Sequence, residues 1–184
     1  MFSIFEAMSF KFILAYLKHQ LTANNRHGTH SPFVYKLADE VIYDFSAKKV
    51  YEAIEAQRKK LLNDDSNVEC TDLGGDSALG KNNINKVSVL AKYLKKPRIA
   101  QLIFRLAVHS KAQNMFVLGV NLGITTAYLA KANLQANLIA MEECSATANI
   151  ANQVFKELDL TNVLLQVGNF ESSLPKVVNE AKVL

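Results

Sequence analysis

One stretch decides the fold: Asn114-Met-Phe-Val-Leu-Gly-Val-Asn-Leu-Gly-Ile-Thr-Thr-Ala-Tyr-Leu-Ala130, in which an apolar run gives way to two glycines and then to an amphipathic pattern. Met115 to Leu118 are apolar without alternation, which is typical of a parallel strand covered on both faces. Gly119 can take a positive φ and let a ligand approach the backbone closely. Thr125 or Thr126 can cap the following helix. The pattern predicts a strand, a ligand-binding turn, and a helix whose free N–H groups face a bound polar group.

The spacing of the two glycines indicates the kind of ligand. A dinucleotide-binding turn has the pattern G-x-G-x-x-G, and its second glycine makes room for a pyrophosphate. Here Gly119 and Gly123 enclose Val120, Asn121 and Leu122, so that Asn121 occupies the place of that second glycine. A bulkier turn suits a ligand without a pyrophosphate, which argues against NAD.

A second apolar strand follows at Asn137 to Met141 and ends in Glu142. An acid about 20 residues beyond a glycine turn can accept hydrogen bonds from both ribose hydroxyls, so the sequence predicts a nucleoside pocket. Ser145 to Leu158 is predicted to be a helix and Asn162 to Gly168 a third strand. The order β-α-β-α-β predicts an α/β fold: a Rossmann-like parallel sheet with helices on both faces.

The first hundred residues are predicted to be mostly helical. The polar, turn-forming run Asn63 to Asn67 is the best candidate for a linker. We therefore expect an N-terminal helical extension over residues 1–62 and a partial Rossmann-like domain over 63–184. The predicted helices of the N-terminal half are Ile4 to Leu21, Pro32 to Tyr43, Ala47 to Leu62, Val87 to Tyr93 and Ile99 to Val108.

Motifs spread over nearly the whole chain support a more specific interpretation. They are His27-Gly-Thr-His-Ser-Pro-Phe-Val-Tyr35, Asp72-Leu-Gly-Gly-Asp-Ser77, Ala100-Gln-Leu-Ile-Phe-Arg105, Leu118-Gly-Val-Asn-Leu-Gly-Ile-Thr-Thr126, Glu142-Glu-Cys144 and Gly168-Asn-Phe170. In this order they resemble the class I S-adenosylmethionine-dependent methyltransferases, and more closely a small bacterial branch with an N-terminal HGxHSPF motif. The resemblance implies a methyltransferase that acts on a small molecule and uses S-adenosylmethionine as its cofactor.

The resemblance also implies roles for individual residues. The first glycine turn would hold the methionine part of the cofactor, the acid after the second strand its ribose, and the segment after the third strand would lie near the adenine. The residues expected to bind the cofactor are therefore Gly119, Val120, Asn121, Gly123, Thr125, Glu142, Glu143, Asn169 and Phe170.

Three residues depart from the pattern of the family. Val117 stands two positions before the first glycine, where an acid usually helps to hold the ammonium group of the cofactor. A lost charge-assisted hydrogen bond costs roughly 1.5–3 kcal/mol, or on the order of ten- to a hundredfold in affinity. We therefore expect weak cofactor binding. Asp76 and Glu143 replace a glycine and a small residue, and their carboxylates favour a cationic ligand.

The largest departure is the C-terminal region. Ser172 to Leu184 is long enough only for a third helix, whereas the family continues with a fourth strand that carries residues beside the transferred methyl. No catalytic residue can therefore be named, and we expect a shortened or degenerate member. The resemblance implies that the three strands are ordered 3-2-1. The first strand, Met115 to Leu118, would then be an exposed edge that favours self-association into a homo-oligomer.

Composition is consistent with this interpretation. The 184 residues are 49% apolar, enough for a core, and the net charge of +4 comes from lysines scattered over helices, which argues against nucleic-acid binding. Two cysteines are too few for a disulfide framework, so a cytoplasmic location is expected. No membrane span is expected, because Glu6, Lys11 and Lys18 interrupt the apolar N-terminus. His27 and His30 lack further ligands, so no metal site is predicted.

Two other functions stay open beside the methyltransferase. A non-catalytic or truncated relative that binds the cofactor weakly, or acts as an interaction module, is favoured by Val117 and the short C-terminus. A P-loop nucleotide binder is suggested by the G-x-x-x-x-G-K spacing of Gly75 to Lys81, although Asn82 stands where Ser or Thr would hold Mg²⁺ and Asp76 would repel phosphate. No G-x-S-x-G motif supports a hydrolase.

Overall fold

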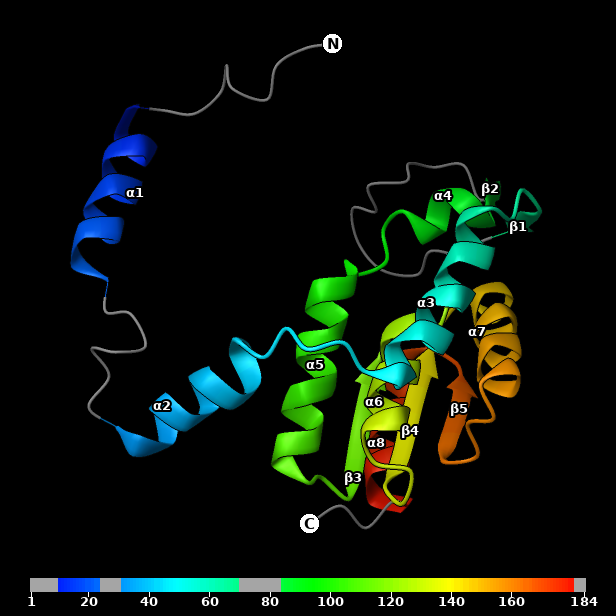
Figure 1. The fold of residues 1–184 in the computed structure, drawn as a ribbon. Helices are drawn as coiled ribbons and strands as arrows, with labels where there is room; N and C mark the ends of the chain where they lie inside the picture. The colour runs from blue at the N-terminus through cyan, green and yellow to red at the C-terminus, as the bar shows by residue number, and fades with distance from the viewer. Residues whose placement is uncertain (1–9, 24–30, 70–83, 181–184) are drawn as a thin grey trace. The chain divides into compact units, whose positions relative to one another are not determined.

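The computed structural model describes residues 10–23, 31–69 and 84–180. The chain divides into two compact units, Met1–Asp44 and Phe45–Leu184 (Figure 1). This division lies earlier in the chain than the expected boundary after residue 62. The reason is that helix α3 (Lys49–Leu62) is part of the second unit and contributes Ile54 and Leu61 to its core.

The first unit contains helices α1 (Phe10–Thr22) and α2 (Pro32–Leu37), and α2 continues as the π-helical segment η3 (Ala38–Ile42). The N-terminus of α2 is as predicted: Ser31 is the N-cap, Pro32 is the first helical residue, and the Val34 N–H donates to Ser31 Oγ at 3.4 Å. The predicted helical residues before Phe10, and the motif from His27 to His30, lie outside the described residues.

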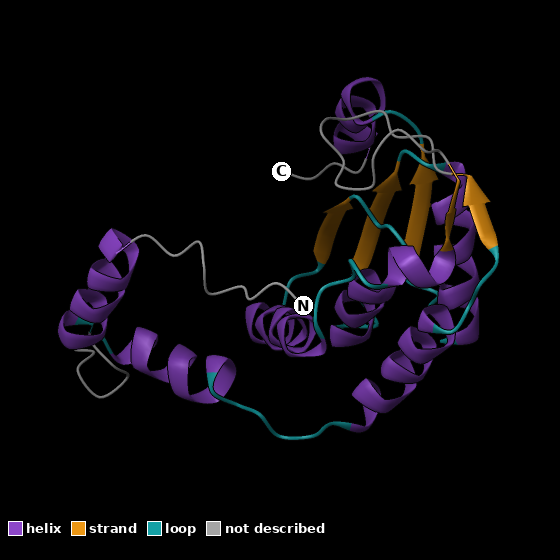
Figure 2. Cartoon of the chain, turned by 90° about the horizontal axis from the view of Figure 1, so that it is seen from above, coloured by secondary structure: helices purple, strands orange, loops and turns teal. Residues whose placement is uncertain are grey.

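The second unit is built on a parallel sheet of three strands, β3 (Asn114–Leu118), β4 (Asn137–Glu142) and β5 (Val163–Val167), in the order β3-β4-β5. Helices α6 (Ile124–Ala132) and α7 (Ser145–Glu157) connect the strands. Helix α8 (Phe170–Glu180) follows β5 and lies on the opposite face of the sheet from α6 (Figures 1 and 2). The predicted Rossmann-like fold and its strand order are confirmed.

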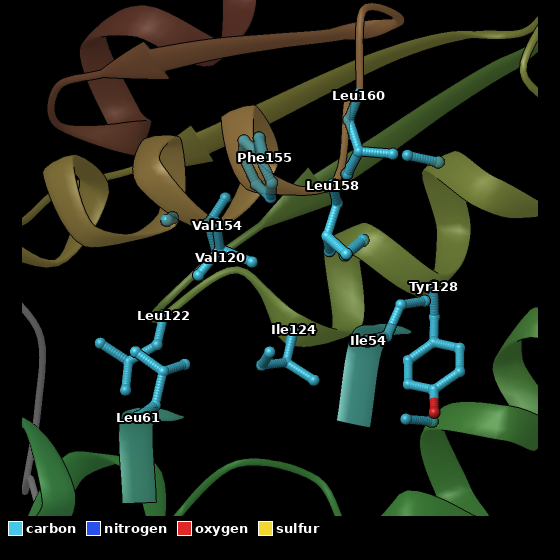
Figure 3. Packing of buried hydrophobic residues seen from close by; sticks show 14 of the residues in the cluster. Ile54, Leu61, Val120, Leu122, Ile124, Tyr128, Val154, Phe155, Leu158 and Leu160 are labelled. Carbon is cyan, nitrogen blue, oxygen red and sulfur yellow. The ribbon is translucent and has the colours of Figure 1, made fainter. Parts of the chain in front are cut away.

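The core lies between the α6 face of the sheet and the helices that cover it. Leu122, Ile124 and Tyr128, from the loop after β3 and from α6, are fully buried and meet α3 and α7 (Figure 3). Burying one such side chain stabilises the fold by about 1.5–3 kcal/mol. The Tyr51 and Phe104 rings add an edge-on contact with their centroids 5.4 Å apart. Because Val120 and Leu122 belong to this core, the core holds the loop between β3 and α6 in place.

A small antiparallel sheet was not predicted. It consists of β1 (Asn67–Glu69) and β2 (Ile84–Lys86), and each strand is too short for its alternation to be recognised in the sequence. The helices α4 (Val87–Ala91) and α5 (Pro97–Ser110) follow, close to the predicted ranges. The P-loop-like run Gly75 to Lys81 lies outside the described residues.

Within the described ranges, no helix has both the length and the apolar character that crossing a membrane requires.

Candidate functional site

The loop between β3 and α6 has a backbone that only certain residues adopt. Gly119, Asn121 and Gly123 have φ angles of +80°, +52° and +85°. Glycine reaches this region without a steric penalty, and asparagine enters it more readily than most residues. Between them, Val120 and Leu122 point into the core and are buried. The two apolar side chains anchor the loop, and its Gly119 and Gly123 N–H groups donate to the Met141 and Val120 carbonyls at 2.9 and 3.1 Å.

The two glycines of the loop have different surroundings. A Cβ atom on Gly123 would lie 2.9 Å from Phe155 Cε1 and 3.0 Å from Ala151 Cβ, so the absence of a side chain there lets α6 pack against α7. A Cβ on Gly119 would meet no atom of the described residues within 4 Å. Gly123 therefore serves packing, whereas the backbone at Gly119 borders open space that a ligand can enter.

Glu142, the last residue of β4, faces this loop. Its Oε2 accepts a hydrogen bond from the Asn121 N–H at 2.7 Å, and its Oε1 accepts one from the Cys144 N–H at 3.1 Å. A carboxylate offers about four lone-pair positions, so capacity for two more donors remains. The half-buried acid thus holds the loop and can still accept hydrogen bonds from a ligand.

The segment after β5 is tied to the same edge of the sheet. The Gly168 N–H donates to the Glu142 carbonyl at 3.0 Å, and the Phe170 N–H donates to Glu143 Oε1 at 2.9 Å. The Asn169 side chain instead accepts a hydrogen bond from the Ser172 N–H at 3.2 Å at the start of α8. Three segments distant in the sequence therefore meet at the carboxyl ends of β3, β4 and β5.

Two buried oxygens near the loop lack hydrogen-bond partners among the described residues: Asn121 Oδ1 and Thr126 Oγ1. The prediction that Thr125 or Thr126 caps α6 is wrong, because the helix begins at Ile124 and Gly123 is its N-cap, without any side-chain cap. Because a buried acceptor without a donor is costly, Asn121 Oδ1 favours a ligand that donates a hydrogen bond.

The structure therefore brings together the residues predicted to bind a cofactor from three strand ends: the loop from Gly119 to Gly123 with Thr125, then Glu142 and Glu143, then Asn169 and Phe170. Sequence reasoning missed the bond between the Asn121 N–H and Glu142. The one available signal was the asparagine itself, since this residue type tolerates positive φ. Among the described residues no group of three or more His, Cys, Asp or Glu could hold a metal ion.

No protein-family model matches this sequence, and no curated protein matches it with significance. Solved structures do match. An O-methyltransferase from Bacillus cereus, solved in complex with SAH, aligns with a TM-score of 0.51 and 15% identity, over 78% of this chain and 52% of that chain. An SAH-bound methyltransferase from Podospora anserina aligns with a TM-score of 0.51 and 15% identity, over 81% of this chain and 56% of that chain. The chain spans about half the length of these proteins. What it shares with them is the fold.

Proposed function

We propose that this chain binds S-adenosylmethionine at the carboxyl ends of β3 and β4 and is the cofactor-binding part of a methyltransferase that acts on a small-molecule acceptor. One observation carries the proposal: Glu142 at the end of β4 bonds the Asn121 N–H of the glycine loop at 2.7 Å. The acid that would bind the ribose is therefore hydrogen-bonded to the loop that would bind the methionine part of the cofactor. The two SAH-bound proteins with the same fold support this choice of cofactor.

The residues present fit such a ligand. Open space at Gly119 leaves room beside the backbone, and the unpartnered Asn121 Oδ1 is an acceptor that the cofactor's ammonium group could satisfy. This matters because Val117, at the position of the family's usual acid, is a half-buried apolar residue that packs against the core. In our proposal the Asn121 amide oxygen takes over part of the role of that acid, with weaker affinity because it carries no charge.

The protein's own residues would bind the cofactor and orient it. Glu142 would accept from the two ribose hydroxyls, the loop from Gly119 to Gly123 and Thr125 would hold the methionine part, and Glu143, Asn169 and Phe170 would border the adenine. When bound, the cofactor supplies a methyl group already activated by its sulfonium. Aligning an acceptor with that methyl is then the main catalytic requirement.

Isothermal titration calorimetry with S-adenosylmethionine tests the proposal. Glu142→Ala should weaken binding on the order of ten- to a hundredfold, because two or more hydrogen bonds to a charged acceptor are lost. Glu157→Ala is the matched control: Glu157 also accepts two hydrogen bonds, from Gln57 and Lys60, but it ends α7 rather than facing the loop. Equal binding by wild type and Glu142→Ala, with both folded by circular dichroism, would refute the pocket.

A second candidate function is binding without methyl transfer, and Val117 favours it because the apolar side chain provides no charge for the ammonium group. The two functions separate in an assay with labelled S-adenosylmethionine and a panel of small phenols, carboxylates and amines. Methylated product from any acceptor eliminates the second candidate.

We also propose that the chain self-associates through β3. Among the described strands β3 pairs only with β4, and Leu118 at its end is 50% exposed. An unpaired edge is a template for another strand. Light scattering should find an oligomer that Leu118→Lys dissociates, whereas Leu134→Lys, at an equally exposed turn residue, should leave it intact. A monomeric wild type would contradict the proposal.

A further inference from the structure

A cavity lies at the start of α3, in the helical layer of the second unit. Its volume is about 340 Å³, and residues that line it include Phe45, Lys48, Tyr51, Glu52, Glu55 and Gln101. A volume of this size suits a small organic ligand. None of these residues belongs to the glycine loop or to the strand ends, so the cavity is separate from the proposed cofactor site.

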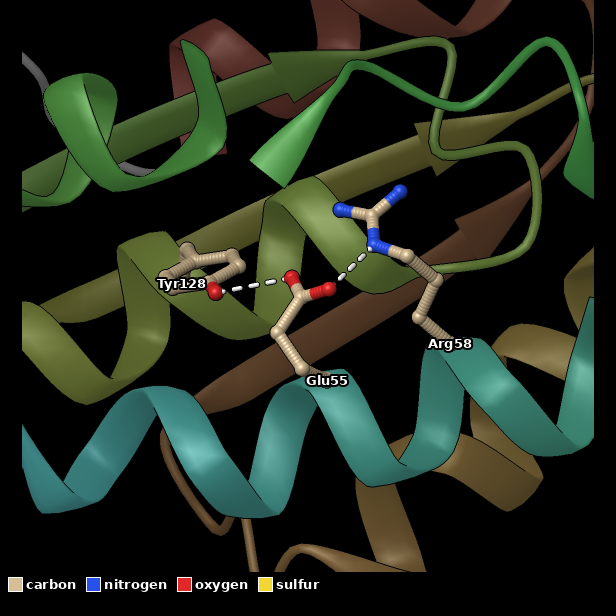
Figure 4. Close-up of polar contacts among 3 residues, drawn as sticks. All are labelled: Glu55, Arg58 and Tyr128. Carbon is tan, nitrogen blue, oxygen red and sulfur yellow. Dashed lines mark hydrogen bonds and ion pairs between the residues drawn. The ribbon is translucent and has the colours of Figure 1, made fainter. Parts of the chain in front are cut away.

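One of the polar groups that line this cavity is a carboxylate held by two donors, that of Glu55. Glu55 Oε1 accepts a hydrogen bond from the Tyr128 hydroxyl at 2.9 Å, and Glu55 Oε2 accepts one from Arg58 Nε at 2.8 Å (Figure 4). The Glu55 side chain is 25% exposed, whereas that of Arg58 is 7% exposed. Tyr128 and Arg58 thus hold the carboxylate in place, and it retains lone pairs for a donor in the cavity.

Tyr51 provides a second, independent indication of a ligand. The residue is 6% exposed and lines the cavity, yet its hydroxyl has no hydrogen-bond partner among the described residues. Its ring is held in place by Phe104 and Tyr128, with centroid distances of 5.4 and 5.6 Å. A buried hydroxyl without a partner is unfavourable, and a polar group bound in the cavity would remove that penalty.

We infer that this cavity binds an organic ammonium ion, a primary amine attached to an apolar ring or chain, between the Glu55 carboxylate and the Tyr51 hydroxyl. The carboxylate can only accept hydrogen bonds, so the ligand must donate, and an ammonium group donates with the help of its charge. The Phe45 and Tyr51 side chains provide apolar surface for the body of the ligand.

The lining carries two carboxylates, those of Glu52 and Glu55, and one ammonium, that of Lys48. Because the buried Arg58 guanidinium already pairs with Glu55 at 2.8 Å, the preference for a cation rests on the remaining lone pairs of the Glu55 carboxylate and on Glu52, not on an excess of negative charge. The Phe45 ring already carries a cation on one face, since the Arg98 guanidinium carbon lies 4.6 Å from its centroid. An anionic ligand would meet the carboxylates instead, and a neutral ligand would gain less from them.

The test measures the binding of phenethylammonium, the probe, to the full chain by isothermal titration calorimetry at neutral pH. Phenylpropanol, a neutral analogue of similar shape, and phenylacetate, an anion, are compared with it. We expect phenethylammonium to bind at least about tenfold more tightly than either. Glu142→Ala should leave this binding unchanged, so that failure of the cofactor site and failure of the amine site give different results.

Variants of three lining residues, Glu55, Tyr51 and Glu52, locate the amine. Glu55→Gln should weaken phenethylammonium binding by about tenfold or more, because a charge-assisted bond becomes a neutral one. Tyr51→Phe removes only an unpartnered hydroxyl, should fold normally, and should weaken binding by roughly three- to tenfold. Glu157→Gln, a carboxylate outside the cavity, is the control. Should Glu55→Gln fail to fold, Tyr51→Phe and Glu52→Gln give the result without it.

Three outcomes would overturn the inference. The first is the absence of phenethylammonium binding up to about 10 mM, because a specific site of this kind should bind more tightly than that. The second is equal affinity for phenethylammonium and phenylpropanol. The third is an affinity for phenethylammonium that neither Tyr51→Phe nor the Glu55 and Glu52 variants reduce.

Discussion

Two carboxylates in the second unit are held in opposite ways. Glu142, at the end of β4, accepts from two backbone N–H groups, those of Asn121 and Cys144. Glu55, on α3, accepts from two side chains, the Tyr128 hydroxyl and the Arg58 guanidinium. The first arrangement depends on the path of the backbone, and the second depends on the identity of residues that three-dimensional packing brings together.

The two regions should therefore tolerate different substitutions. At the loop, most side chains can change as long as the positive φ angles and the buried anchors Val120 and Leu122 remain. In the helical layer, a single side-chain change removes a donor and leaves a partner without its hydrogen bond. The following predictions test the contrast.

The largest effect should come from the backbone of the loop. Gly123→Ala should lower the free energy of unfolding by about 2–5 kcal/mol, because the added methyl meets Phe155 and Ala151 at 3.0 Å or less and the φ of +85° is strained for alanine. Gly119→Ala has the same kind of strain without the clash and should cost only about 1–2 kcal/mol. Urea unfolding of both variants measures the difference. Equal losses would show that packing at Gly123 is not what requires a glycine.

The next effect concerns the helical layer. Tyr128→Phe should lower the free energy of unfolding by about 1–3 kcal/mol, since the partly buried Glu55 carboxylate loses a donor. Urea unfolding at neutral pH measures this value. A stability equal to that of the wild type would mean that water replaces the tyrosine hydroxyl and that the side-chain arrangement around Glu55 is as tolerant as the loop.

The same tyrosine predicts a dependence on alkaline pH. Burial, and then the hydrogen bond to Glu55, raise the pKa of Tyr128 above its ordinary value of 10. The folded state therefore favours the neutral phenol, and this contribution is complete below about pH 10 and declines as the pH rises further. Unfolding free energies of wild type should fall more steeply above that pH than those of Tyr128→Phe. Parallel curves would contradict the assigned pKa direction.

The smallest effect is expected at an exposed carboxylate with side-chain partners. Hydrogen bonds from Lys60 and Gln57 hold the pKa of Glu157 below its ordinary value. Lys60→Met should therefore raise the pKa of Glu157, because the larger of the two contributions is removed. An NMR titration of the side-chain carboxyl measures the shift. Lys59→Met, an exposed neighbour on the same helix, is the control and should leave this pKa unchanged.

The amino-acid pattern was enough to place the three parallel strands and the glycine loop, whereas the order of the strands came from the resemblance to the methyltransferases. The strands and the loop follow from patterns that are local: apolar runs such as Met115 to Leu118, a glycine where the backbone must turn, and an acid at a strand end. Local patterns are informative because strand and turn preferences are set by each residue's own backbone and side chain. The residue types at Gly119, Asn121 and Glu142 are the basis for predicting a site there, which stays a prediction.

Three features became apparent only from the folded structure: which N–H groups donate to the Glu142 carboxylate, the close contact of Gly123 with α7, and the place of α3 in the α/β unit. The folded structure also joined Glu55, which lines a cavity that no motif indicated, to Tyr128, 73 positions later in the chain. These features depend on contacts between distant segments. Such contacts are selected by the close packing of the whole core, which no single stretch of sequence contains.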